Sequence, residues 1–373
     1  VIPRGHYIDN AAAIKSVVKI PVIGVGRIND PLIAESILES VKVDLVTMSR
    51  ASLADPDMPR KYQEGKTDEI IRCIGCLQGC IGENAKGNPI RCLVNPIMGM
   101  ESEYDLSAAP VKKKVLVIGG GVAGSEAAIM LAQRGHKVTL CEAKGQLGGQ
   151  WVAASIPIGK EEFNSFLVWQ RHQLEKLGVD IRLSTKVDKA LVDSEKPDAV
   201  IVATGSFPVR PPIPGLDGEN VVSAHDILNS EVEVSGKVVV IGGGLVGAET
   251  ADHLAQHGCQ VSIIEMLPQI VKDGEYIPTK YLMKRLAEHN VDVFTSAKVT
   301  GVTADTVSFQ LDGQDRQIAG VDYVVVAVGV RPNNTLANEL KDSGYEVLVV
   351  GDAQSIKNGY MNIREGFEAG MAV

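Results

Sequence analysis

Aromatic residues are scarce in this chain of 373 residues, in which Phe, Trp and Tyr together make up 4%. The hydrophobic cores must therefore be built mainly from Val, Ile, Leu and Ala. The sequence also has no run of 18 apolar residues, so it predicts no helix that spans a bilayer. Basic residues are outnumbered, with 37 Lys and Arg against 46 Asp and Glu and a net charge of −9. This balance argues against nucleic acid or an anionic membrane as a general partner.

The beginning of the chain, Val1-Ile2-Pro3-Arg4, has neither a Met nor a signal-like apolar run, and we interpret it as an internal start. A disulfide scaffold is not expected in a chain of this length. Of the six cysteines, Cys141 and Cys259 fall inside apolar, strand-like runs, where a buried free thiol is the ordinary interpretation. The cysteine usage therefore predicts a reducing, cytoplasmic compartment.

Glycine, in contrast, is abundant at 38 residues, and much of it belongs to an internal repeat. The segment Lys114–Gly124 recurs 123 residues later as Lys237–Gly247. A later apolar run, Ala199–Gly205, recurs as Tyr323–Gly329. Two copies of one dinucleotide-binding unit are the simplest explanation of this pattern.

Each copy contains a Gly-x-Gly-x-x-Gly motif between an apolar strand and a helix. Its first glycine permits a tight turn, the second lets the backbone approach a pyrophosphate, and the third allows close helix–strand packing. An acidic residue about 20 positions further on can accept hydrogen bonds from an adenosine ribose. Glu142 and Glu265 follow their motifs at equal distances of 18 residues.

The surroundings of the two copies predict which dinucleotide each one holds. Only the first copy is followed by a second glycine-rich stretch, residues 145–150, and by a distant acidic residue at a strand end, Asp352, that could contact a flavin ribityl chain or its water. We therefore assign FAD to the first copy and NAD(H) to the second. The predicted FAD residues are Gly119, Gly121, Ala123, Gly124, Glu142, Gly149, Gln150, Ala203, Thr204, Gly205 and Asp352. The predicted NAD(H) residues are Gly242, Gly244, Gly247, Glu265 and Gly329.

A different architecture precedes the repeat. Residues 20–26 and 44–49 are apolar strand candidates, and a helix that starts after Asp30-Pro31 joins them. This strand–helix–strand order predicts a parallel sheet. Gly26, Arg27 and Arg50 lie at the two strand ends, where parallel βα units commonly bind phosphate.

Four cysteines lie within 20 residues, in a segment predicted to be a loop, with the spacing Cys73-x2-Cys76-x3-Cys80-x11-Cys92. Four thiolates can hold an iron–sulfur cluster or a tetrahedral zinc ion. Zinc sites usually have a second short Cys pair, whereas Cys92 stands alone. The spacing favours iron–sulfur, with a structural zinc and unliganded cysteines as the alternatives.

The order of these motifs resembles the flavin and iron–sulfur branch of the old yellow enzyme family. This branch includes 2,4-dienoyl-CoA reductases, enoate reductases and the trimethylamine dehydrogenase type. The most specific matches are Cys73-Ile74-Gly75-Cys76 and residues 91–96, Arg-Cys-Leu-Val-Asn-Pro. The resemblance implies a 4Fe–4S cluster on the four cysteines, FMN phosphate at Gly26, Arg27 and Arg50, and FAD in the first repeat.

The resemblance also implies an α/β fold with four parts. They are the C-terminal end of a TIM barrel (residues 1–66), a cysteine-rich cluster segment and linker (67–112), a Rossmann-like FAD domain (113–232 with 345–373) and a nested NAD(H) domain (233–344), as in glutathione reductase. About six of the eight barrel strands have no counterpart here. We therefore interpret the chain as the C-terminal part of such an enzyme, in which no catalytic acid or base can be named. The apolar residues Ile20, Val22, Ile23, Leu45 and Val46 are expected to face solvent.

The expected function is that of an NADH-dependent flavin oxidoreductase. Electrons would pass from NADH through FAD and the cluster to a barrel-bound FMN, which reduces an activated C=C bond of a small-molecule substrate. One alternative is an amine dehydrogenase of the trimethylamine dehydrogenase type. A second is a non-catalytic, nucleotide-binding fragment with a zinc knuckle. The expected partners beyond the substrate are a further copy of the chain or a separate N-terminal barrel segment.

Overall fold

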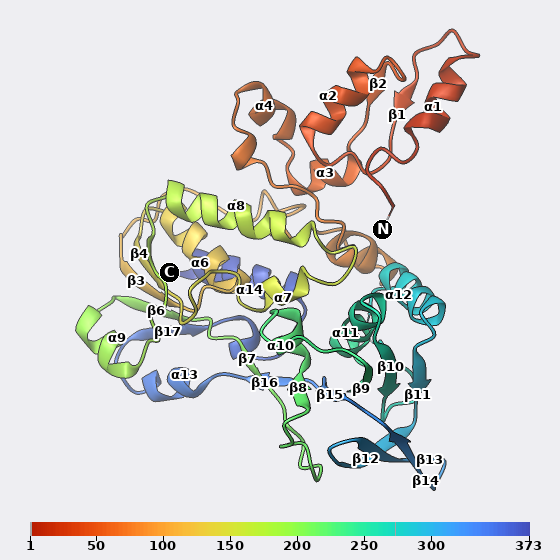
Figure 1. Cartoon of the computed structure of the whole chain (residues 1–373). Helices are drawn as coiled ribbons and strands as arrows, with labels where there is room; N and C mark the ends of the chain where they lie inside the picture. The colour runs from red at the N-terminus through yellow and green to blue at the C-terminus, as the bar shows by residue number, and fades with distance from the viewer. Residues whose placement is uncertain (1, 273) are drawn as a thin grey trace.

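The computed structural model describes residues 2–272 and 274–373. Figure 1 shows a front segment (2–66) that stands above helix α8, and two sheet-based units below. The cysteine segment (67–112) follows beneath the front segment. The first unit contains α8 and the C-terminus, and the second lies beside it around α11 and α12.

The first unit is built on a five-stranded parallel sheet with the strand order β17-β6-β3-β4-β5. Its central strands are apolar and almost completely buried, as expected for a parallel sheet covered on both faces. The strands are β3 (Lys114–Ile118), β4 (Lys137–Cys141), β5 (Asp180–Arg182), β6 (Ala199–Val202) and β17 (Glu346–Val349). The helices are α6 (Val122–Gln133), α7 (Gln150–Ala154), α8 (Phe163–Lys176), α9 (Lys189–Glu195), α13 (Thr335–Leu340) and α14 (Gly359–Ala372).

Helix α14 packs directly on α6, and glycine makes this close approach possible. A Cβ atom on Gly366 would collide with the carbonyl group of Ala123, and one on Gly370 would press against Met130. The last residues of the chain are thereby joined to the helix that opens at the first glycine motif.

The second unit repeats this plan with the strand order β11-β10-β9-β15-β8, again all parallel. Its elements are β8 (Val221–Ser223), α10 (Ala224–Leu228), β9 (Lys237–Ile241), α11 (Leu245–Gln256), β10 (Gln260–Ile264), α12 (Tyr276–Glu288), β11 (Asp292–Phe294) and β15 (Tyr323–Val326). An antiparallel sheet of β12 (Ala297–Val302), β13 (Thr306–Leu311) and β14 (Gln314–Ala319) follows β11.

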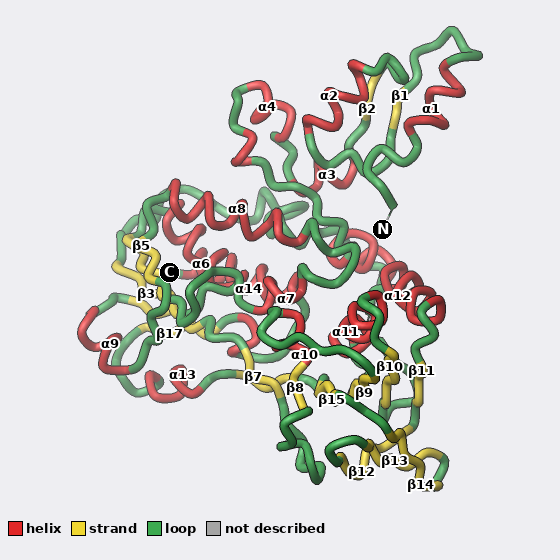
Figure 2. Tube along the Cα trace, in the orientation of Figure 1, coloured by secondary structure: helices red, strands yellow, loops and turns green. Residues whose placement is uncertain are grey.

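Two short antiparallel strands, β7 (Ser206–Pro208) and β16 (Val330–Pro332), lie where the chain leaves the first unit and where it returns (Figure 2). The predicted boundary at residue 232 places β8 in the first unit. The structure differs, because β8 pairs with β15 at the edge of the second sheet.

The front segment contains two short parallel strands, β1 (Ile23–Gly24) and β2 (Leu45–Val46), with four helices. The helices are α1 (Ile8–Lys15), α2 (Pro31–Glu39), α3 (Ser49–Ala54) and α4 (Met58–Gln63). Helix α2 begins as predicted, with the Asp30 carboxylate accepting a hydrogen bond from Leu32 N. Ile20, Ile23 and Leu45 are exposed as expected (71%, 56% and 53%), whereas Val22 and Val46 are half-buried.

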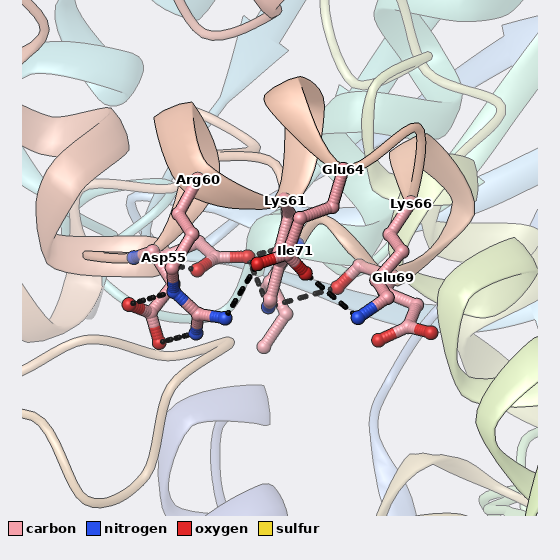
Figure 3. A network of polar contacts seen from close by, with 8 residues as sticks. Asp55, Arg60, Lys61, Glu64, Lys66, Glu69 and Ile71 are labelled. Atoms are coloured by element: carbon pink, nitrogen blue, oxygen red, sulfur yellow. Dashed lines mark hydrogen bonds and ion pairs between the residues drawn. The ribbon is translucent and has the colours of Figure 1, made fainter.

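The cysteine segment is joined to the front segment through Asp55 (Figure 3), and the Asp55 side chain is only 3% exposed. The Asp55 carboxylate pairs with Lys61 Nζ at 2.6 Å and accepts a hydrogen bond from Ile71 N at 3.0 Å. Lys61 also donates to the Glu69 carbonyl oxygen at 3.0 Å. The segment predicted to be a loop also contains the short elements η1 (Thr67–Glu69), η2 (Gln78–Gly82) and α5 (Glu83–Ala85).

Among the described residues, no helix combines the length and apolar character needed to cross a membrane.

Candidate functional site

The first glycine motif forms a turn that only glycine can make. Gly119 has φ +107°, and a Cβ atom there would collide with the Ala203 carbonyl group. A Cβ atom on Gly124 would collide with the Gly119 carbonyl oxygen. Gly121, in contrast, faces open space at the beginning of α6, where a Cβ atom would have no neighbour within 4 Å. This arrangement leaves free room for an anion at the helix N-terminus.

The predicted ribose acceptor, Glu142, lies beside this turn and is 9% exposed. Its carboxylate accepts hydrogen bonds from Gly120 N at 2.7 Å and from Lys144 N at 2.8 Å. The second glycine-rich stretch also reaches the turn, because Gly148 N donates to the Gly120 carbonyl oxygen at 2.8 Å. A Cβ atom on Gly149 would lie 3.1 Å from Gly121 Cα.

Gln150 and Asp352 come together through a residue that the sequence analysis missed. Gln150 Nε2 donates to Ser206 Oγ at 2.6 Å, and Ser206 Oγ donates to Asp352 Oδ2 at 3.3 Å. Asn362 Nδ2 donates to the other Asp352 oxygen at 2.8 Å. Ser206 and Asn362 are isolated polar residues without a motif, so no sequence signal identified them.

The remaining predicted residues of this set border the same region. Ala123 lies 3.1 Å from the position of a Cβ on Gly351, next to Asp352. Thr204 Oγ1 donates to the Asn333 carbonyl oxygen at 2.5 Å, and Asn333 N donates to the Gly205 carbonyl oxygen at 2.9 Å. The structure therefore brings the whole predicted FAD set to one end of the first sheet.

The second glycine motif reproduces the first in detail. Gly242 has φ +103°, and a Cβ atom there would collide with the Ala327 carbonyl group. A Cβ atom on Gly247 would collide with the Gly242 carbonyl oxygen, as one on Gly124 would with that of Gly119. Glu265 accepts from Gly243 N at 2.6 Å and from Leu267 N at 2.7 Å. Gly244 faces open space. Gly329 lies just before β16, where its carbonyl oxygen accepts from Val209 N at 3.0 Å.

The four clustered cysteines line one cavity. Its wall also includes Arg50, Leu53, Ile74, Leu93 and Val94. Burial raises the pKa of the Cys73 and Cys76 thiols and raises that of Cys92 to about 12. Backbone N–H groups of Gly75, Gln78, Val94 and Asn95 offset part of this shift by donating to the sulfurs. Metal ligation requires such thiols in their deprotonated form.

The four thiols are candidate ligands of a metal group. A structural zinc ion needs its four donors at about 2.0–2.3 Å from one point. Among the described residues, no three Cys, His, Asp or Glu side chains are grouped to hold a metal ion. The four thiols nevertheless surround a common cavity.

The scarce aromatic residues gather between this cavity and the first unit. Trp151, Phe163, Phe166 and Tyr360, which we call the aromatic wall, are buried together with Ile74 and Leu93. Trp151 stacks on Phe163 with ring centroids 5.1 Å apart. Because Trp151 directly follows Gln150, the wall joins the predicted FAD region to the cysteine cavity.

The predicted phosphate residues of the front segment have different surroundings from one another. Gly26 has φ +138° and packs against the backbone of His6 and Tyr7. Arg27 forms an ion pair with Glu162 of the first unit at 2.8 Å and donates to the Ile2 carbonyl oxygen at 2.7 Å. The Arg50 side chain lies at the cysteine cavity instead. Sequence reasoning missed Glu162.

Comparison with known proteins agrees with this architecture. Residues 113–356 match the pyridine nucleotide-disulphide oxidoreductase family, and residues 3–69 match the NADH:flavin oxidoreductase / NADH oxidase family. The chain is 41% identical to an NADH oxidase of Thermoanaerobacter brockii over 98% of its length and 57% of that protein. It is 40% identical to a bilirubin reductase of Mediterraneibacter gnavus over 93% of its length and 55% of that protein.

Among solved structures, a 2-naphthoyl-CoA reductase in complex with 2-naphthoyl-CoA superimposes with a TM-score of 0.95 at 30% identity. The superposition covers 99% of this chain and 57% of the reductase. The chain thus spans somewhat more than half the length of the relatives it matches. It belongs to the pyridine nucleotide-disulphide oxidoreductase family, within the flavin and iron–sulfur branch of the old yellow enzyme family.

Proposed function

We propose that this chain is the electron-delivering part of an NADH-dependent flavin oxidoreductase that reduces an activated C=C bond in a small molecule. The observation that carries the proposal is the continuity from the first glycine motif, through the aromatic wall, to the cysteine cavity and Arg50. The names of the related oxidase and reductases support the same reaction class.

The second unit would bind NADH. The open space at Gly244 receives the pyrophosphate at the beginning of α11, and Glu265 lies at the end of β10 for the adenosine ribose. The Glu265 carboxylate already accepts two backbone N–H groups, which fix its orientation. A fixed carboxylate selects a ribose with a free 2′-hydroxyl.

The first unit would bind FAD by the same device. Gly121 and the beginning of α6 face the pyrophosphate, and Glu142 faces the adenosine ribose. The chain Gln150–Ser206–Asp352 supplies hydroxyl, amide and carboxylate groups for the part of the ligand beyond the pyrophosphate. These polar groups are held by Asn362 on α14, which is itself locked against α6.

The cysteine cavity would hold a 4Fe–4S cluster, with Cys73, Cys76, Cys80 and Cys92 as ligands. FMN would lie on the front segment near Gly26, Arg27 and Arg50. When bound, these groups and FAD supply hydride and single-electron transfer. The residues of the chain supply the binding sites, their order and the exclusion of water by the aromatic wall.

The proposal is tested by anaerobic purification followed by cofactor analysis. We expect FAD, about four irons per chain, and bleaching of the flavin absorption by NADH. Zinc in place of iron would support the nucleotide-binding fragment with a zinc knuckle. Retained flavin and iron with no reduction by NADH or NADPH would support the amine dehydrogenase alternative.

A further inference from the structure

Glu162 of the first unit makes polar contacts with the front segment. It immediately precedes α8, and its side chain is 14% exposed. Its Oε1 atom pairs with Arg4 Nε at 2.9 Å and with Arg27 Nη2 at 2.8 Å. Its Oε2 atom accepts a hydrogen bond from Asn29 Nδ2 at 2.6 Å. One carboxylate thus engages three donors that lie more than 130 positions earlier in the chain.

Asn29 extends this contact to the cysteine cavity. Its side chain is 3% exposed, and Nδ2 donates a second hydrogen bond to the Cys73 carbonyl oxygen at 2.7 Å. Both amide protons are therefore used on oxygen acceptors. A flipped amide would turn its own oxygen toward the Glu162 and Cys73 oxygens, so the orientation of Asn29 is fixed.

The balance of charge makes Glu162 the critical member of the group. Its removal would leave two guanidinium groups, with side chains 32% and 19% exposed, and the Asn29 amide without their common acceptor. Breaking a partly buried, charge-assisted pair from one side is costly because the remaining groups stay desolvated. The Arg27 guanidinium also approaches Gly75, at 4.0 Å from a Cβ position there, so the disturbance would reach the loop between Cys73 and Cys76.

We propose that Glu162 is a positioning residue that docks the front segment on the first unit and, through Asn29, fixes the Cys73 end of the cysteine segment. The inference rests on the proposed function only for the identity of the group that Cys73 holds. Loss of this one carboxylate would therefore disturb the contacts that the first unit makes with both the front segment and the cysteine segment.

The test compares Glu162→Ala with Glu161→Gln in the full chain. Glu161 is the neighbouring control because, among the described residues, its carboxylate accepts a hydrogen bond only within its own loop, from Gly159 N at 2.9 Å. Hydrogen exchange is measured by mass spectrometry on peptides covering residues 22–29 and 72–76, with 114–118 of β3 as the internal reference. We expect exchange to rise about tenfold in the first two peptides of Glu162→Ala and to stay unchanged in β3 and in Glu161→Gln.

Asn29→Leu separates the two halves of the proposal. It leaves the Arg–Glu162 pairs in place, so exchange should rise at residues 72–76 more than at 22–25. Unchanged protection at 72–76 in both Glu162→Ala and Asn29→Leu would overturn the inference. If β3 loses protection as well in Glu162→Ala, the milder variant Glu162→Gln, which keeps an oxygen acceptor, takes its place. Glu162→Gln must restore the protection of β3 while residues 72–76 stay partly exposed. Equal protection of β3 and of residues 72–76 in Glu162→Gln would also overturn the inference.

Iron content of the same samples gives an independent readout. Glu162→Ala should lower the iron retained after gel filtration relative to Glu161→Gln, because Cys73 is less well placed. Iron missing from the unaltered protein would count against the proposed function, whereas the exchange pattern alone decides the role of Glu162.

Discussion

Glu126 is a buried acid whose ionisation opposes folding. It lies two residues after Gly124 on α6, is 3% exposed, and accepts a 3.2 Å hydrogen bond from Gln170 Nε2. Burial raises its pKa to about 7, and the Gln170 bond lowers it only in part. Its counterpart in the repeat, Glu249, pairs instead with Lys160 at 2.5 Å. Equivalent positions of the two units thus place the same residue in opposite electrostatic surroundings.

The first prediction concerns this acid in the apoprotein. The unfolded carboxyl loses its proton near pH 4.5 and the native one near pH 7, so the free energy of unfolding should fall with rising pH within that interval and then level off. Glu126→Gln removes this fall and should stabilise the first unit at pH 8, by about 3 kcal/mol at most. The free energy of unfolding is measured by urea unfolding at pH 5 and pH 8. The fluorescence of Trp151 and Trp169 reports on the first unit because both tryptophans lie in it. A less stable Glu126→Gln protein at pH 8 would contradict the assignment.

The second prediction concerns Glu265 and the choice of nicotinamide nucleotide. A 2′-phosphate would face its carboxylate, and the sequence has no Lys or Arg between Glu265 and Lys272. Because the site is open to solvent, the repulsion should amount to about 1 kcal/mol, or roughly a five- to tenfold preference for NADH. Glu265→Gln should reduce this preference. Dissociation constants from fluorescence titration decide it, and equal affinities in the unaltered protein would remove Glu265 from the ribose site.

At the scale of elements, the glycine turns were predictable because each glycine meets a steric requirement that leaves a signature in the sequence. Gly119 and Gly242 both face a carbonyl group of the adjacent strand connection. The antiparallel sheet β12–β13–β14 was missed, although β12 alternates buried and exposed residues as a half-buried strand does. The Glu162 contact could not be predicted, since its partners are far apart in sequence and carry no motif.

The third prediction concerns the cysteine segment as an element. Cys76→Ser should abolish iron binding and leave FAD bound, because the contacts of the first glycine turn lie outside the cavity. The aromatic wall nevertheless packs against both the cysteine segment and the beginning of α6. We therefore expect a lower stability of the first unit along with the loss of iron. Iron analysis and chromatography of released flavin provide the measurement. Cys259→Ser, a buried thiol of the second unit, is the control and should keep its iron. Simultaneous loss of flavin and iron would show that the two sites do not form independently.

At the scale of the whole molecule, the front segment presents apolar side chains that a completed barrel would cover. Ile23 and Leu45, on the two strands, and Ile20, which precedes β1, are more than half exposed, whereas a βα-barrel needs eight strands to close. At roughly 25 cal/mol per Å² of apolar area, covering several such side chains is worth several kcal/mol. Further barrel strands from outside these residues, or a second copy of the chain, are the candidate covers.

The last prediction separates these covers by FMN binding. Arg27 and Arg50 could contact only a phosphate, and Arg27 is already engaged by Glu162, so the chain alone should bind FMN weakly. A fluorescence titration with FMN measures this. If a second copy covers the strands, association should rise with protein concentration in sedimentation while FMN affinity stays low, because no strands for the flavin ring are added. If a separate segment completes the barrel, adding that polypeptide should produce stoichiometric FMN binding and lower the exposure of Ile23 and Leu45. Tight FMN binding by the chain alone would mean that the flavin ring needs fewer strands than a closed barrel provides.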